Sequence, residues 1–366
     1  MAENMGNDMM ENQIEQDVTM EVTDKKCPQC GATLKFNPGT MSLSCEFCGY
    51  SKQLPKAETG EAVVELDFKT ATIRSSCEWG TKKKSIVCKQ CGGEAIYDAL
   101  DTAATCPFCG SSSVMPVDNI EDVMSPGGIV PFEISKEKAE QLFKSWLGGK
   151  LFAPKAAKQS CQAKDFQGIY LPFWTYDCDT TSTYSARLGF EYGSGDNKKI
   201  RWKNYSGVYD QFIDDEIVYG SKKTVSPELK AVSNFDFKKI QPYSPEIVAG
   251  FAAERYSVGL DEGWTKAQQT IKPKLHSGLT NQLRKAYHPD RIEGIKMATN
   301  YDNITFKYLL APIWMAAFKY NDKTYNIAIN GQTGRVAGKS PISAIRVIIA
   351  IIIAIAIFAF IMSLQK

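Results

Sequence analysis

The chain has little histidine. Only two of its 366 residues are His, at positions 276 and 288, so a catalytic cysteine would find few imidazole bases to activate it. Three cysteines, Cys77, Cys161 and Cys178, stand outside any closely spaced pair. A lone cysteine most often behaves as a small buried hydrophobic residue, so we interpret these three as packing residues and not as nucleophiles.

The chain also lacks an excess of charge of either sign. Lys and Arg together number 43, and Asp and Glu 41, which leaves no global field to attract nucleic acid or an anionic membrane surface. The local exception is the run Lys82-Lys83-Lys84 beside Trp79. We interpret this run as a solvated linker, with phosphate contact and base stacking as the alternative.

No apolar secretory segment opens the sequence, so we expect the bulk of the chain to lie in the reducing cytosol, where disulfides are rare. Residues 1–24 contain seven acidic side chains and no Lys or Arg. This composition predicts a disordered acidic tail over residues 1–24.

Two segments that resemble nucleotide-binding or chaperone signatures lack the context that those functions need. Gly334–Ser340 has three residues between its glycines where a phosphate-binding loop has four, and Pro341 follows in place of a helix start. The tripeptide His-Pro-Asp at 288–290 matches the signature loop of the chaperone J-domain, which joins two helices. Here a strand-like segment follows it, and Pro273 is expected to interrupt the preceding helix. We therefore expect a surface turn at each place and no enzyme.

What the chain does have is cysteine, eleven residues in all, eight of them in pairs with two residues between the partners. The pairs form two modules, each reading Cys-x2-Cys, fourteen residues, Cys-x2-Cys, and the second repeats the first 61 positions later. The modules are predicted to be zinc ribbons over residues 25–56 and 85–117, joined by a connector over 57–84. The predicted metal ligands are Cys27, Cys30, Cys45, Cys48, Cys88, Cys91, Cys106 and Cys109.

This spacing has a chemical reason. Two intervening residues let both thiolates of a pair reach one ion at about 2.3 Å, and the glycine after each second cysteine permits a turn that aims backbone N–H groups at sulfur. Four protein thiolates leave no position for water, so we expect two structural Zn²⁺ ions and no catalytic metal. Such an ion supplies roughly 10 to 16 kcal/mol to a module too small to build its own core. Disulfides and a rubredoxin-like iron site are the alternatives.

From residue 118 the pattern changes, and residues 118–342 are predicted to form one α+β domain. A strand is expected over Ile129–Ile134, and helices over Lys136–Leu147, Pro245–Tyr256 and Glu262–Tyr287. Hairpins are expected from 168–190 with 199–219, and from 304–320 with 324–330. Because both hairpins open with a Pro-x-Trp motif, the domain is predicted to consist of two related halves.

The first of these hairpins carries side chains that elsewhere serve binding or catalysis. Asp177 and Asp179 bracket Cys178, but alternation along a strand puts both on one face, and we interpret them as solvated. Five aromatic residues are interpreted as packing the sheet against a helix, with an aromatic binding surface as the alternative. They are Trp174, Tyr176, Trp202, Tyr205 and Tyr209.

The end of the sequence is the longest apolar run. Val347–Leu364 comprises eighteen residues, eight of them Ile, and no charge. As a helix it would be about 27 Å long, close to the roughly 30 Å hydrocarbon thickness of a bilayer, so a transmembrane helix is predicted over residues 343–364. Arg335, Lys339 and Arg346 precede the apolar run Val347–Leu364, and only Lys366 follows it. The positive-inside rule then predicts a single-pass tail anchor with the large N-terminal part in the cytoplasm and the C-terminus outside.

Several motifs together resemble a bacterial family of membrane-anchored double zinc-ribbon proteins, often labelled TFIIB-type zinc-ribbon or primosomal-helicase-like proteins. The resemblance runs from about Lys25 to the C-terminus, with Ala311 a minor departure in the second Pro-x-Trp motif. It implies a membrane platform for envelope-stress proteins of the SPFH/flotillin-like and phage-shock-protein-A-like kinds. The helicase label implies an ATPase, and we discard that implication because the chain has no intact Walker A motif. The motifs are Ser85–Ala103 with Thr105–Gly110, Ile129–Phe132, Gly168–Trp174, Ala249–Phe251 with Ala253–Tyr256, and Asn330–Gly334.

The fold class expected is thus multi-domain: two tandem zinc ribbons, an α+β domain of two related halves and one C-terminal transmembrane helix. The expected function is a membrane-tethered, non-enzymatic scaffold that recruits cytosolic proteins. The alternative is a membrane-tethered zinc-ribbon protein that binds nucleic acid.

Overall fold

The computed structural model describes residues 26–54, 63–69, 83–98, 105–117, 124–154, 157, 166–222, 227–321 and 323–364. The predicted acidic tail over 1–24 lies outside these residues. So do Cys77, Trp79, Lys82, Cys161 and Lys366, and the side chain of Lys83 is not described either.

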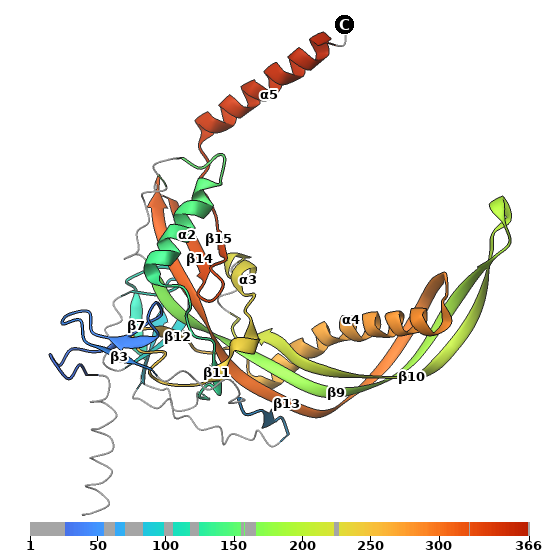
Figure 1. The fold of residues 1–366 in the computed structure, drawn as a ribbon, viewed down its shortest axis with the longest axis horizontal. Helices are drawn as coiled ribbons and strands as arrows, with labels where there is room; N and C mark the ends of the chain where they lie inside the picture. Colours follow the sequence, from blue (N-terminus) through green and yellow to red (C-terminus); the bar gives the residue numbers. More distant parts are fainter. Residues whose placement is uncertain are drawn as a thin grey trace, which may run out of the picture.

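Three long antiparallel strands form the backbone of the fold: β9 (Gln167–Tyr192), β10 (Lys199–Tyr219) and β13 (Arg291–Tyr320). Beyond the body of the molecule they continue together as a curved extension, which we call the arm and define as residues 176–217 and 260–306 (Figure 1). Helix α4 (Leu260–Tyr287) lies along one face of the arm. The predicted hairpin of β9 with β10 is confirmed, and the turn at 193–198 includes η3 (Gly195–Asn197).

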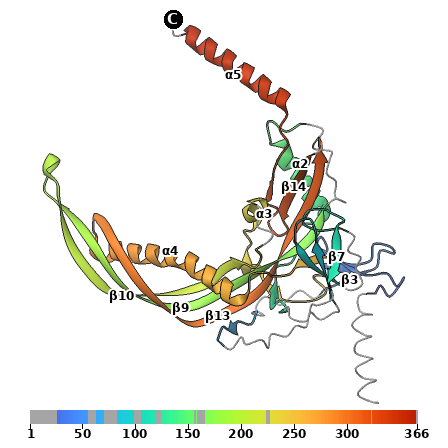
Figure 2. The same cartoon turned by 180° about the vertical axis from the view of Figure 1, so that it is seen from behind.

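In the body, β9 and β13 belong to a twelve-stranded sheet. Strand β14 (Lys323–Asn330) pairs with β13 in the second predicted hairpin, and β15 (Val336–Gly338) pairs with β14. The short strands that complete this part of the sheet are β4 (Leu66–Asp67), β8 (Gly128–Ile129), β11 (Gln241–Pro242) and β12 (Ala252–Glu254). Helices α2 (Lys136–Gly148) and α3 (Pro227–Val232) and the turn η4 (Phe237–Lys239) lie beside the sheet, and α5 (Ala344–Leu364) projects away from it, as Figure 2 shows from behind.

In the residues that the structure describes, each cysteine module contributes three strands. The first forms a separate sheet of β1 (Lys35–Asn37), β2 (Ser42–Ser44) and β3 (Ser51–Gln53). The second contains β5 (Lys83–Cys88), β6 (Glu94–Asp98) and β7 (Val114–Val117), and β6 pairs with β12 of the large sheet. The second module is therefore continuous with the body through hydrogen-bonded strands.

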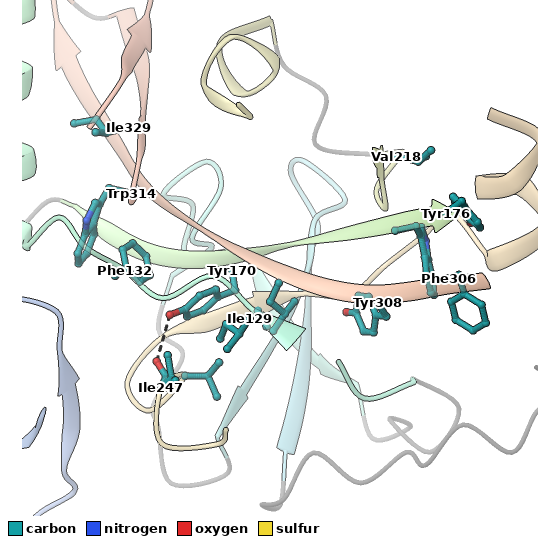
Figure 3. Packing of buried hydrophobic residues seen from close by; sticks show 14 of the residues in the cluster. Ile129, Phe132, Tyr170, Tyr176, Val218, Ile247, Phe306, Tyr308, Trp314 and Ile329 are labelled. Atoms are coloured by element: carbon teal, nitrogen blue, oxygen red, sulfur yellow. Dashed lines mark hydrogen bonds between the residues drawn. The ribbon is translucent and has the colours of Figure 1, made fainter. Parts of the chain in front are cut away.

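Aromatic residues fill the core where the two Pro-x-Trp motifs meet. Strands β9 and β13 pair so that Leu171 lies opposite Ala311, and each of these residues immediately precedes the proline of its motif. On one face, Phe132 packs against Tyr170 and Trp314 with ring centroids 5.2 and 4.7 Å apart (Figure 3). The origin of the two motifs in related halves of the domain stays a prediction.

Three expectations about elements were wrong. Pro245–Tyr256 is not a helix: it contains turns followed by β12, because the buried segment Ala252–Glu254 completes the sheet between β9 and β6. The strand expected over Ile129–Ile134 ends at Ile129, two residues before Pro131, which has no N–H to pair. Helix α4 runs through Pro273 without interruption, since this proline lies on the exposed side of the helix.

Candidate metal centres

Each metal centre is built from two turns that hold a cysteine pair. In the first module, the N–H of Gly31 donates to the carbonyl of Cys27 at 2.8 Å, and the N–H of Gly49 donates to the carbonyl of Cys45 at 3.1 Å. The second module repeats both bonds at 2.9 Å, from Gly92 to Cys88 and from Gly110 to Cys106. The four turns thus share one backbone geometry, as the 61-residue repeat predicted.

The glycine in each turn is required by its backbone angle. The four φ values are +72°, +75°, +70° and +73°, a left-handed conformation that disfavours residues with a Cβ atom. In three of the turns a Cβ atom would meet nothing within 4 Å. Glycine is therefore needed because the turn around the sulfurs requires a positive φ, and not because a neighbouring atom leaves no room for a side chain.

The four sulfurs of each module lie close enough to share one ion. The Sγ atoms of Cys27 and Cys48 are 3.3 Å apart and those of Cys30 and Cys45 3.5 Å; the matching distances in the second module are 3.7 and 3.6 Å. A tetrahedron with zinc–sulfur bonds of about 2.3 Å has edges of roughly 3.8 Å. A disulfide needs about 2.05 Å. Within each module all four sulfurs lie within 4.8 Å of one another.

The negative charges of the thiolates favour a cation at the centre of the four sulfurs. The N–H groups of Cys48 and Phe47 point at the sulfur of Cys45 and lower its pKa to about 7. The N–H of Tyr50 acts in the same direction on Cys48, but the Cys27 sulfur and burial outweigh it and raise the pKa of Cys48 to about 12. One thiolate therefore opposes ionisation of the next, and a bound divalent cation is what lets all four ionise together.

The second centre behaves in the same way. Burial raises the pKa of Cys88, but the N–H groups of Cys91 and Gln90 outweigh it and lower the value to about 7. Burial is also the main cause that raises the pKa of Cys91 to about 11. Two four-cysteine sites that fit zinc are thus present, and every ligand predicted from the sequence belongs to one of them.

The two modules differ in how much of them the body covers. The aromatic residue before the last cysteine is Phe47 in the first module and Phe108 in the second, 61 positions later. Phe108 is 8% exposed and packs over Gly93 beside strand β14, whereas Phe47 is 82% exposed. The first module instead docks through Phe36, whose N–H donates to the carbonyl of Ala249 at 3.0 Å.

A groove of about 430 Å³ runs between the two modules and the body. Its walls include β1 and the second cysteine turn of the first module, the start of α2, and the segment around Gln167. Lys35 and Glu46 on this wall form an ion pair with a nitrogen–oxygen distance of 2.9 Å. The side-chain amide of Gln167 donates to Thr105 of the second module at 3.0 Å, which fixes the position of that module at the groove.

A third group of acidic residues lies where the arm meets the body. A bulge in β10 contains Asp214 and Asp215, which lie close to Asp177 of β9. The ammonium group of Lys307 on β13 lies 3.0 Å from Asp215 and 3.6 Å from Asp177. Lys307 also contacts Glu65 at 2.9 Å. Since Lys307 forms ion pairs with Asp177 and Asp215, and Asp177 also accepts a backbone hydrogen bond, we assign the group a structural role.

This cluster corrects the interpretation of Asp177. The side chain was expected to be solvated, but it is almost completely buried and accepts a hydrogen bond from the N–H of Asp215. Asp179 is exposed as expected and accepts from the Asn303 amide at 2.8 Å. No local signal pointed to Lys307 or Glu65, because their partners come from distant parts of the chain.

The remaining motifs lie in structural contexts that fit the interpretations made from the sequence. Residues 288–290 join α4 to β13, a helix to a strand, so the two-helix context of a J-domain is missing there. Gly334–Ser340 includes strand β15 and leads to α5 without a helix start at its glycines. Cys178 is buried, and Trp174 and Tyr176 pack against α4 and its preceding segment, donating to the carbonyls of Val258 and Leu260.

Helix α5 is long and apolar enough to cross a membrane. It has 21 residues with a mean hydropathy of 3.2 over its most apolar window, and the body buries none of them. At about 1.5 Å per residue it is about 31 Å long, which matches the hydrocarbon thickness of a bilayer. The absence of burial distinguishes it from a core helix, in agreement with a single-pass tail anchor.

Comparisons with known proteins assign no activity to the chain. No family model matches the chain, and no solved structure matches it. The chain is similar to YdjG of Bacillus subtilis (strain 168), whose own name describes it as an uncharacterized protein. The two are 28% identical over 322 residues, which cover 87% of this chain and 90% of YdjG.

Proposed function

We propose that the protein is a membrane-tethered, non-enzymatic adaptor that recruits cytosolic proteins through its zinc ribbons. Helix α5 spans the bilayer, and Arg335, Lys339 and Arg346 on its N-terminal side keep the body in the cytoplasm by the positive-inside rule. Both metal sites are closed by four thiolates, so the two Zn²⁺ ions hold the fold and leave no position for a reacting water.

The observation that carries this proposal is the contrast between Phe47 and Phe108. The repeat places equivalent aromatic side chains on both ribbons, and the body covers one of them and leaves the other in solvent. Large aromatic residues dominate the energetics of protein interfaces when a partner buries them. A zinc-bound turn also holds Phe47 in place before binding, which reduces the entropy lost on association.

The groove between the ribbons gives the partner a second region to contact. Glu46, the neighbour of Phe47 in the chain, lines this groove together with Lys35. Side chains of both signs suit a polar rim around an aromatic anchor better than they suit a polyanion. For this reason a protein segment is the partner we favour over nucleic acid.

The membrane tether favours binding because it raises the local concentration of the ribbons. A tail anchor confines the ribbons to a thin layer beside the bilayer, which raises their effective concentration toward anything else held there, so weak contacts suffice. Proteins of the SPFH/flotillin-like and phage-shock-protein-A-like kinds, which the family resemblance names, are the candidates for such a partner in an envelope-stress response.

Capture of full-length protein from membranes in mild detergent tests the proposal. Phe47→Ser removes the aromatic anchor without touching a metal ligand, so we expect the co-purifying partner to fall several-fold while zinc content stays unchanged. The matched control is Phe212→Ser on the arm, where an equally large side chain is 59% exposed and the partner should be retained. Equal capture by both variants would contradict recruitment through the first ribbon, and loss of the partner on nuclease treatment would favour nucleic acid.

A further inference from the structure

A second apolar feature lies at the base of helix α5. Helix α2 ends at Gly148, and the loop that follows exposes two large apolar side chains, Leu151 (76% exposed) and Phe152 (37% exposed). Figure 1 shows the end of α2 directly beside the start of α5. Exposure of two neighbouring apolar side chains to water is unfavourable, so we expect a binding partner to cover them.

Hydrogen bonds hold the loop to the first turn of α5. The N–H of Ser343 donates to the carbonyl of Phe152 at 2.9 Å. The guanidinium group of Arg346 donates to the carbonyl of Leu151 at 3.3 Å and also to that of Ala153. The height of Leu151 and Phe152 along the axis of α5 is therefore fixed by the structure.

Two more apolar side chains lie at that height, one just before α5 and one in its first turn. Ile342 and Ile345 flank the loop contact, and both side chains are largely exposed. The loop with Leu151 and Phe152 therefore lies beside α5 and adds two apolar side chains to the apolar surface of the helix. A surface that continues from a membrane-spanning helix is covered by the same lipid.

The polar groups of the loop suit the boundary between lipid and water. Arg346 satisfies two carbonyls that would otherwise lose their hydrogen bonds on leaving water, and its charge stays at the level of the loop. Lys150 lies over the ring of Trp146, with its ammonium 4.8 Å from the ring centroid. Trp beside Lys or Arg is the combination enriched at membrane–water interfaces.

We infer that Leu151 and Phe152 insert into the interfacial layer of the bilayer that α5 spans, as a second membrane contact. This inference rests on the proposed tail anchor and adds an orientation to it. A single helix lets the body swivel, whereas a helix and a loop fixed beside it define which side of the body faces the membrane. The ribbons, at the other end of the body from α5 (Figure 1), then face the cytoplasm.

Photo-cross-linking to lipid tests the contact. Full-length protein carries p-benzoylphenylalanine in place of Leu151, Phe152, Ile353 or Phe212, one site per variant, and is reconstituted into phosphatidylcholine–phosphatidylglycerol vesicles that contain a fluorescent lipid. Zinc content of each variant confirms that it has folded. We expect lipid labelling at 151, 152 and 353 several-fold above that at 212, which lies on the arm and is matched to Phe152 in side-chain type.

The outcomes separate the second contact from the anchor. Labelling at 353 with none above the 212 level at 151 and 152, or cross-links from 151 and 152 to protein alone, overturns the second contact and leaves the anchor intact. Absence of labelling at 353 overturns the anchor itself.

Discussion

At the scale of single residues, sites formed by residues close in the sequence can be predicted from it, whereas ion pairs between distant residues cannot. The eight cysteine ligands were predictable because each pair forms within one turn, and the glycine that the turn needs stands next to it. Lys307 was not predictable, since its carboxylate partners come from β10, from β9 and from the segment near β4. These three segments come together only in the folded sheet.

The Lys307 cluster leads to a prediction about stability. Lys307→Met leaves Asp177 buried without a countercharge, which costs about 3–5 kcal/mol of unfolding free energy at neutral pH. Denaturant unfolding monitored by Trp fluorescence in detergent measures the loss, and Lys307→Met with Asp177→Asn should recover part of it. A loss below about 0.5 kcal/mol, the usual size of a surface effect, would contradict a structural role for Lys307.

The same variant should depend on pH in a definite direction. Burial raises the pKa of Asp177 above its ordinary value, and the positive charge of Lys307 opposes this rise. Without Lys307 the pKa rises further, so the folded state binds the proton more tightly than the unfolded chain does. The stability deficit of Lys307→Met is therefore expected to shrink as the pH falls from about 7 toward 5.

At the scale of elements, periodic patterns were informative and short segments were not. Helix α4 was predicted almost to its ends because apolar residues recur every four positions on its buried side, from Ala267 to Leu283. Pro245–Tyr256 was assigned wrongly because a strand of three residues has no period to detect, and its pairing with β6 and β9 decides its structure. The continuity of α4 through Pro273 shows packing overriding local preference.

The contact between α4 and the sheet gives a prediction at this scale. Gly263 faces Tyr176, and a Cβ atom there would lie 2.2 Å from the tyrosine hydroxyl oxygen. Gly263→Ala is therefore expected to destabilise the protein by about 1–3 kcal/mol through overpacking, although alanine is the better helix former by about 1 kcal/mol. In a Tyr176→Phe background the same change should cost less, and a double-mutant cycle on unfolding free energies measures the coupling. Additive effects would show that the close approach carries no energy.

At the scale of the whole molecule, the anchor and the ribbons lie at different ends of one body (Figure 1). The sequence predicted the two cysteine clusters and the apolar helix, because both depend on composition and spacing along the chain. It did not predict that the second module joins the large sheet through β6 and β12, or that Phe36 docks the first. These contacts mean that substitutions such as Phe47→Ser separate recruitment from folding better than deletion of residues 25–117.

The central claim is that two zinc-bound ribbons belong to a protein tethered in the membrane. Elemental analysis of full-length protein, extracted with mild detergent from carbonate-washed membranes, tests it most directly. We expect two zinc ions per chain, one for each four-cysteine group, and one ion after Cys88→Ser with Cys91→Ser, because a structural site loses its ion when two thiolates are removed. Fewer than two metal ions in the wild-type protein, iron in place of zinc, or absence of the protein from the washed membranes would contradict the claim.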